Sequence, residues 1–283
     1  MHGRIDGADI LDARQFYVAI KKLADSLSYG TDRSPFLGSG QEYVQSRPYQ
    51  FGDPIKAIDW RVTARTRQFH VKEYEAPKRL PAYILLDTSA SMTVASAGRS
   101  KYETAVFLAG GLALACLDRI SPVGLLGVGE RNIHVRPSLS KDLVMQWLHQ
   151  LRTYHHDEGT TLGDRVVDLT PSLGQRVLAI VLSDLHDPRA LAALKRMGQQ
   201  HDVVVLQLRD PAERGLSGVG FVRAVEAETG RGFVTRGRLP QADRADELRR
   251  AGIDHLMIDT DRPYASRVRL YFKSRALLGR GAR

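Results

Sequence analysis

The chain has 283 residues and a mass of 31.5 kDa, and 43% of its residues are hydrophobic, which is enough to bury a large core. Its formal net charge at pH 7 is +9, but much of the excess lies at the C-terminal end, where seven basic residues and no acidic residue follow Asp261. No basic run interleaved with aromatic residues resembles a nucleic-acid-binding module, so the pattern argues against that class of partner.

The first residues of the chain lack the apolar segment of a signal peptide, because Asp6, Asp9 and Asp12 interrupt them. The longest apolar stretch, residues 105–117, is shorter than the roughly 20 residues that span a bilayer. The single cysteine, Cys116, lies in this stretch and can form no internal disulfide. We therefore expect no membrane span, a cytoplasmic location and a core position for Cys116.

Residues 1–80 differ in pattern from the rest of the chain. A helix is predicted over residues 8–27, and a segment rich in Gly, Ser and Pro follows it. Polar and apolar residues then alternate from Phe69 to Tyr74, as they do in a strand. We expect an N-terminal α+β appendage, residues 1–80, that packs on an α/β domain, residues 81–283, with a basic C-terminal helix or tail.

From residue 81 onward, short apolar runs alternate with longer helical stretches, which predicts an α/β domain with a mostly parallel sheet. The expected strands cover residues 82–87, 123–129, 177–184, 203–210 and 253–258. The expected helices cover residues 101–118, 141–151, 162–168, 188–199, 242–251 and 266–278. The strands are continuous apolar runs, so both faces of the sheet should be covered. Helix 101–118 is apolar almost all round, so it should be buried, with Gly110 and Gly111 allowing close packing.

Polar side chains follow two of the expected strands at their carboxyl ends, where open α/β sheets bind ligands. Asp87 ends the first strand in LLDTSASM, and Asp184 ends the later strand VLAIVLSD. Serines two and four residues after Asp87 can point the same way if the turn stays extended, and EGTTLG adds threonines. These further candidates are Ser89, Ser91, Thr160 and Thr161. Hard oxygen ligands suit Mg²⁺ or Mn²⁺ rather than zinc, so we predict such a site at the surface rim.

The segments LLDTSASM, EGTTLGDRV and VLSDLHD resemble the three loops of the metal-ion-dependent adhesion site in the von Willebrand factor type A fold. By this resemblance, the metal-site residues are Asp87, Ser89, Ser91, Thr160 and Asp184. Thr160 is favoured over Thr161 because the family threonine stands two residues before the apolar position that is Leu162 here.

The upstream run RPYQFGDPIKAIDWRVTARTRQFHVKEYE resembles the signature of the domain of unknown function 58 family, whose members carry a type A domain after it. The resemblance covers the chain from Arg47 to the C-terminus. It implies a Rossmann-like, mostly parallel sheet flanked by helices. It also implies genes that are found beside those of MoxR-type AAA+ ATPases. Many relatives are anchored in a membrane, whereas no spanning segment is expected here.

A site of this kind implies a binding function rather than catalysis. A metal held by hydroxyl groups keeps much of its positive charge, so it favours an acidic residue supplied by a partner protein. We therefore expect a non-enzymatic, metal-dependent adaptor that works with a MoxR-type AAA+ ATPase. The alternative is a Mg²⁺-dependent hydrolase of the haloacid dehalogenase type. That chemistry needs an acid two residues after the first aspartate, where this chain has Ser89.

Two other groups of polar residues have simpler interpretations. Residues 155–158, HHDE, are expected to form a polar loop that is available for partner contact, because adjacent residues seldom converge on a metal. The charges of the upstream segment favour internal salt bridges over recognition, since Tyr49 and Trp60 interleave with them as a small core would. These charges are Arg47, Asp53, Asp59 and Arg65.

Overall fold

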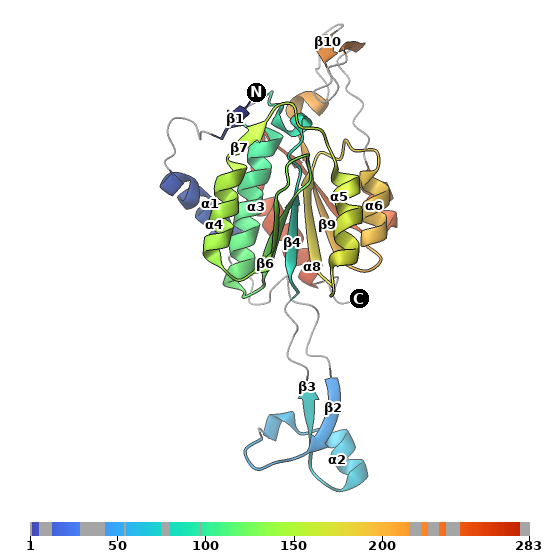
Figure 1. Cartoon of the computed structure of the whole chain (residues 1–283). Coiled ribbons are helices and arrows are strands. Elements are labelled where there is room, and N and C mark those ends of the chain that lie inside the picture. The colour runs from blue at the N-terminus through green and yellow to red at the C-terminus, as the bar shows by residue number, and fades with distance from the viewer. Residues whose placement is uncertain are drawn as a thin grey trace.

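The computed structural model describes residues 2–5, 13–28, 43–53, 55–74, 80–96, 98–214, 222–225, 232–235 and 244–277. At its centre is a six-stranded sheet (Figure 1). The strands are Ala82–Leu86 (β4), Val123–Gly127 (β5), His134–Ser138 (β6), Leu178–Ser183 (β8), Asp202–Arg209 (β9) and Asp254–Asp259 (β12).

The sheet order is β12-β9-β8-β4-β5-β6, and every neighbouring pair is parallel except β5 and β6. This is the Rossmann-like order, in which the direction of winding reverses beside the first strand, here between β4 and β8. The prediction of a mostly parallel α/β sheet is confirmed. Strand β6 was not predicted, because its residues HVRPS alternate poorly and include a proline, which edge strands tolerate.

Helices cover both faces of the sheet (Figure 1). Helices Ala13–Ser28 (α1), Lys101–Asp118 (α3), Lys141–Leu151 (α4) and Ala265–Leu277 (α8) share one apolar cluster. Helices Leu162–Leu169 (α5), Ala190–Met197 (α6) and Ala245–Arg250 (α7) share the other. In β4, Ile84 and Leu86 lie in the first cluster while Tyr83 and Leu85 lie in the second. A strand buried on both faces therefore reads as a continuous apolar run.

The remaining elements are short. Strands His2–Arg4 (β1) and Thr153–His155 (β7) pair antiparallel, as do Val222–Val225 (β10) and Gly232–Thr235 (β11). Single 3-10 turns occur at Ile55–Ala57 (η1), Ala90–Thr93 (η2), Thr170–Ser172 (η3) and Pro211–Arg214 (η4). In the ranges that the structure describes, no helix combines the length and the apolar character that crossing a membrane requires.

Helix α1 packs closely on α3 at two glycines. A Cβ atom added to Gly110 would lie 2.7 Å from Ile20 Cδ1, and one added to Gly111 would lie 2.8 Å from Leu23 Cγ. Both distances are shorter than real Cβ contacts, so a side chain at either position would force Ile20, Leu23 or α1 itself to move. The predicted role of the two glycines in close packing is confirmed.

Gly111→Val should therefore destabilise the protein, because its side chain overpacks the contact between α1 and α3. Overpacking of this kind typically lowers the free energy of unfolding by about 1–3 kcal/mol. Equilibrium denaturation in urea measures the loss. The matched control is Gly174→Ala, since no atom lies within 4 Å of its added Cβ. A Gly111→Val variant as stable as this control would contradict the packing described.

The second half of the appendage is a small unit apart from the sheet and helices (Figure 1). Strands Tyr43–Pro48 (β2) and His70–Tyr74 (β3) pair antiparallel, and helix Trp60–Thr66 (α2) lies between them in sequence. Asp59 begins α2 by accepting from the backbone N–H groups of Arg61 and Val62, and Ser46 Oγ donates to it over 2.7 Å. A buried acid therefore organises this unit, as N-capping aspartates do.

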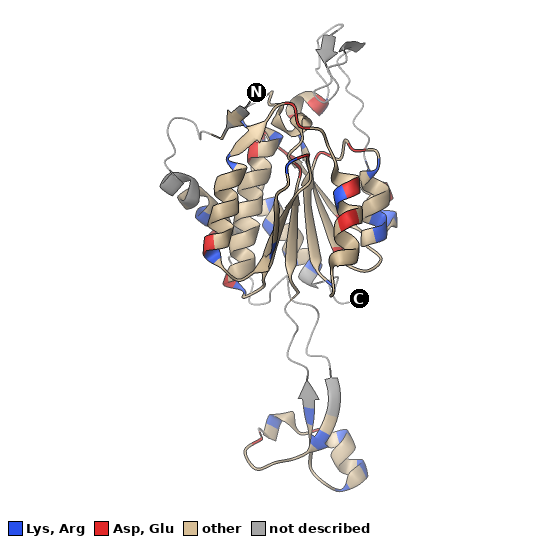
Figure 2. Cartoon of the chain, in the orientation of Figure 1, with Lys and Arg blue, Asp and Glu red and all other residues tan. Residues whose placement is uncertain are grey.

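Internal pairing of the unit's charges is confirmed for Arg47 and Asp53, whose two contacts measure 2.7 and 2.8 Å. The prediction that Tyr49 and Trp60 form a small core is wrong: they are 36% and 63% exposed. The hairpin is too short to cover them. Figure 2 shows several basic residues on this unit. Residues 1–80 thus contribute α1 to the main body and a second unit apart from it, and the domain boundary at residue 80 stays a prediction.

Candidate metal centre

Asp87 follows β4 at the point in the sheet where the winding reverses, next to β8. Its backbone N–H donates to Leu182 O over 2.9 Å, so Asp87 continues the hydrogen bonding between β4 and β8. The Asp87 carboxylate accepts from the Ser89 N–H at 3.0 Å and from Ser183 Oγ at 2.5 Å. It is 1% exposed, and in the described part of the chain it makes no ion pair.

The two serines after Asp87 come together, although the turn does not stay extended. Ser89 is extended, but a single 3-10 turn, η2, begins directly after it. This turn brings the Oγ atoms of Ser89 and Ser91 to 3.1 Å, and Ser91 Oγ donates to Asp184 Oδ2 over 2.8 Å. A chain of polar contacts thus links the ends of β4 and β8.

The two threonines of the EGTTLG turn have different roles. Thr161 Oγ1 donates to Gly129 O at 2.9 Å, so this hydroxyl fixes the turn to the loop after β5. Thr160 Oγ1 is buried and has no hydrogen-bond partner among the described residues. A buried hydroxyl without a partner is costly, and this hydroxyl forms no hydrogen bond with the other four candidate residues.

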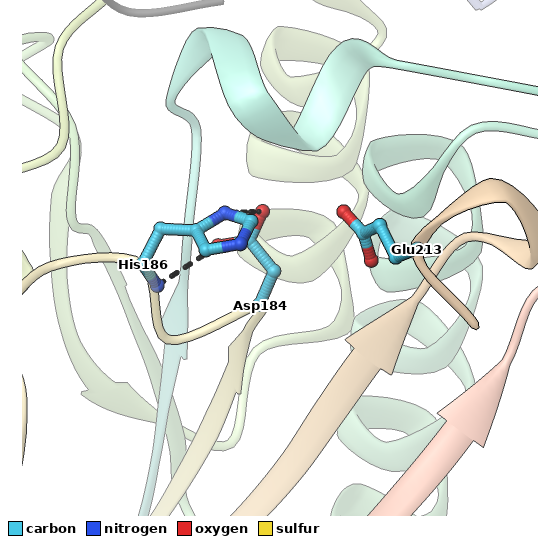
Figure 3. A group of neighbouring side chains, drawn as sticks. All are labelled: Asp184, His186 and Glu213. Carbon is cyan, nitrogen blue, oxygen red and sulfur yellow. Dashed lines mark hydrogen bonds and ion pairs between the residues drawn. The ribbon is translucent and has the colours of Figure 1, made fainter. Parts of the chain in front are cut away.

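Asp184 also belongs to a second group of ionisable side chains (Figure 3). Lys101 Nζ lies 2.7 Å from Asp184 Oδ2 and also contacts Glu213 Oε1. His186 Nδ1 lies 3.0 Å from Asp184 Oδ2. Ligand atoms of Asp184, His186 and Glu213 all lie within 4.8 Å of one another, so the group has the composition of a cation site.

The two aspartates have opposite electrostatic environments. Burial and the charge of Asp184 raise the pKa of Asp87, which disfavours its ionised form. Burial also opposes ionisation of Asp184, but Lys101 and His186 outweigh it and lower the pKa of that carboxyl. Asp184 has a cationic partner, whereas Asp87 has none among the residues that the structure describes. The site is thus short of positive charge on the side of Asp87.

The polar loop predicted over residues 155–158 is only partly available for partner contact, because His156 and Asp157 are exposed but Glu158 is not. His155 ends strand β7, and Glu158 is 2% exposed. The Glu158 carboxylate accepts from Thr88 Oγ1 at 2.6 Å and from Arg131 Nε at 2.8 Å. Glu158 therefore joins three loops beneath the candidate site and cannot contact a partner, whereas His156 remains exposed.

The predicted position at the surface rim is also wrong, because the four contacting residues are at most 8% exposed. They are Asp87, Ser89, Ser91 and Asp184. Exposed side chains border them. His156 Nδ1 lies 3.3 Å from Thr93 Oγ1, and the His186 side chain is 41% exposed.

The side chains present fit a hard divalent cation. The donor set consists of carboxylate and hydroxyl oxygens, which Mg²⁺ and Mn²⁺ prefer. Within the described ranges, the Thr160 hydroxyl has no hydrogen-bond partner and the Asp87 carboxylate has no ion pair, so either group could bind such an ion. Sequence reasoning missed Ser183, Lys101 and Glu213 around this set. Only Lys101 carried a signal, as a cation in the first turn of an apolar helix, where the helix dipole disfavours it.

A family model described as protein of unknown function DUF58 matches residues 45–250. The uncharacterized protein Rv1480 of Mycobacterium tuberculosis strain H37Rv is 26% identical, over 97% of this chain and 92% of the relative. The uncharacterized protein Mb1516 of Mycobacterium bovis matches with the same identity and the same coverage.

The chain also has weak similarity to two solved structures. The crystal structure of the SpRpn10 VWA domain has a TM-score of 0.40 and 13% identity, covering 67% of this chain and 93% of that domain. An uncharacterized membrane spanning protein from Vibrio fischeri has a TM-score of 0.21 and 14% identity, covering 69% of this chain and 98% of that one.

Proposed function

The chain belongs to the DUF58 family and has a von Willebrand factor type A-like fold, and from this premise we propose that it is a metal-dependent protein-interaction module. In this proposal, Mg²⁺ or Mn²⁺ binds between the ends of β4 and β8. Its ligands, direct or through water, are Asp87, Ser89, Ser91, Thr160 and Asp184. The function is non-enzymatic.

The observation that carries the proposal is the polar cluster at the ends of β4 and β8, where Ser89 Oγ lies 3.1 Å from Ser91 Oγ and Ser91 Oγ donates to Asp184 Oδ2. The Thr160 hydroxyl, one of several buried polar groups with no partner among the described residues, is available to join it. Burying an unsatisfied hydroxyl costs roughly 1–3 kcal/mol, and an ion beside it removes that cost. Asp87 supports the same conclusion, since a carboxylate buried beside a second acid is stabilised by a cation.

The proposed ligand of the metal is an acidic side chain of a partner protein. Hydroxyl ligands carry no charge, so they leave the ion electropositive, and a partner carboxylate would complete its coordination. The partner we propose is a MoxR-type AAA+ ATPase, with this chain as an adaptor in assembly or remodelling of a complex. The cytoplasm is the proposed compartment, for which the buried free thiol of Cys116 gives support.

A hydrolase of the haloacid dehalogenase type gains no support. Its general acid would stand two residues after Asp87, and Ser89 occupies that position with its Oγ 3.1 Å from Ser91 Oγ. A serine hydroxyl does not titrate near neutral pH, so it cannot serve as the proton donor in phosphoryl transfer.

Co-purification with a MoxR-type AAA+ ATPase from the same organism tests the proposed function. Recovery should be high in Mg²⁺ and should fall at least about tenfold in chelator, since a charge-assisted contact is worth roughly 1.5–3 kcal/mol. The double variant Ser89→Ala/Ser91→Ala should behave in Mg²⁺ as the wild type behaves in chelator.

Ser172→Ala is a matched control, because this hydroxyl donates only to Leu169 O at the end of α5. Its recovery should follow that of the wild type in both conditions. Equal recovery of all variants, with or without chelator, would refute a metal-bridged complex even if the two proteins still bind.

A further inference from the structure

Lys101 is an unusual residue for its position. It is the first residue of α3, yet its side chain is 1% exposed. Burying an ammonium group costs several kcal/mol unless it is paired, and the N-terminus of a helix repels a cation. The wild-type chain tolerates both penalties, so the contacts of Lys101 must compensate for them.

Those contacts are two carboxylates. Lys101 Nζ lies 2.7 Å from Asp184 Oδ2 and also contacts Glu213 Oε1, which belongs to the η4 turn after β9. Figure 3 shows Glu213 facing Asp184 and His186 across a short gap. The ammonium group therefore binds two of the three side chains whose ligand atoms converge within 4.8 Å.

We propose that Lys101 is a tethered cation that fills a second cation subsite, formed by Asp184, His186 and Glu213, and so limits the chain to one divalent ion. The ammonium also positions Asp184 toward Ser91 before a metal binds. The position of the divalent ion beside Asp87 rests on the proposed function, whereas the subsite filled by Lys101 does not.

The charges of these residues support one divalent ion beside Asp87 and the ammonium group in the second subsite. The buried Asp87 and Asp184 and the partly buried Glu213 carry three negative charges when ionised, and Lys101 neutralises one of them. One divalent ion would balance the remaining two. Without the ammonium, Asp184, His186 and Glu213 would offer two carboxylates and an imidazole, a ligand set that suits Mn²⁺ and other transition metals.

Titration calorimetry with Mn²⁺ tests the proposal through the number of ions bound. Wild type should bind one ion per chain, and Lys101→Met, which has a similar length but no charge, should bind two. The double variant Lys101→Met/Glu213→Gln should return to one. Lys101→Arg keeps the charge and should also bind one ion. Lys195→Met is the control, since this lysine is 42% exposed and pairs with Glu247.

Thermal unfolding gives a second readout. Mn²⁺ should raise the melting temperature of Lys101→Met more than that of wild type, because a ligand that binds only the native state stabilises it. If Lys101→Met does not fold, Lys101→Gln replaces it, as it keeps hydrogen-bond donors without the charge. Two ions in wild type, or no additional ion in either neutral variant, would overturn the proposal.

The same titrations separate this proposal from the proposed function. In one outcome, wild type binds no ion, Lys101→Met binds one, and adding Glu213→Gln removes it. This result would support the second subsite and refute the metal centre at Asp87. In the other outcome, wild type binds one ion that depends on Asp87, and Lys101→Met binds no additional ion. This result would support the metal centre and refute the proposed role of Lys101.

Discussion

Replacing Asp87 by asparagine should weaken the binding of Mg²⁺ or Mn²⁺ by more than about 100-fold, because even residues behind the ligands of a metal typically contribute 10- to 100-fold. Asparagine keeps the shape of the side chain and an oxygen that can accept from the Ser89 N–H. The negative charge is the main loss. Titration calorimetry with Mn²⁺ measures the change in affinity.

The same variant should be at least as stable as wild type when both are measured in chelator. Burial and Asp184 raise the pKa of Asp87 in the folded state, so at neutral pH its ionised form costs folding free energy, and a neutral side chain removes that cost. Asp168→Asn, an exposed acid on α5, is the control for both measurements. Unchanged affinity in Asp87→Asn would exclude Asp87 from the metal centre.

The central sheet was predictable because its signals are local. Helices α3 and α4 begin at the predicted residues since Ser100 and Ser140 cap them, accepting from the N–H groups of Glu103 and Leu143. The apolar strands could be predicted without knowing which strands they pair with, because a strand covered on both faces is apolar throughout. Strand β6 was missed because it depends on pairing with β5 rather than on its own residues.

The proposed metal-site residues follow from spacing and resemblance, but the side chains that surround them could not be predicted. Lys101 and Glu213 are far apart in sequence and meet only because α3 begins at the same edge of the sheet where the turn after β9 lies. Sequence distance gives no sign of such a contact. The exposure of Trp60 was missed for a related reason, since the number of residues available to cover an aromatic ring depends on tertiary packing.

Glu158 shows most clearly what composition cannot indicate. In sequence it ends a run of four polar residues, which is typical of an exposed loop. In the structure, Gly129 leaves the space that it fills, since a Cβ atom added to Gly129 would lie 2.2 Å from both Glu158 Oε1 and Thr88 Oγ1. The burial of Glu158 therefore depends on a glycine in a different loop.

Glu158→Ala should consequently be the most destabilising substitution near the metal centre. It removes the acceptor of Thr88 Oγ1 and of the Arg131 N–H, together with the ion pair to Arg131 Nε. Removing one partner of a buried ion pair costs about 3–5 kcal/mol, and we expect the lower end because Arg131 is 19% exposed and can reach water. Urea denaturation in chelator measures this loss independently of any metal.

Two further variants separate the role of the carboxylate from that of the loop. Glu158→Gln keeps an oxygen acceptor for Thr88 and should lose less stability than Glu158→Ala. Glu130→Ala, an exposed acid of the neighbouring loop, should change the free energy of unfolding by no more than about 0.5 kcal/mol. The Ala90 N–H donates to the backbone carbonyl of Glu158, so loss of the Glu158 side chain should also displace the η2 turn that carries Ser91. The affinity for Mn²⁺ should therefore decrease together with the free energy of unfolding. A Glu158→Ala variant that is as stable as Glu130→Ala and binds Mn²⁺ like wild type would show that the three loops hold the site without this acid.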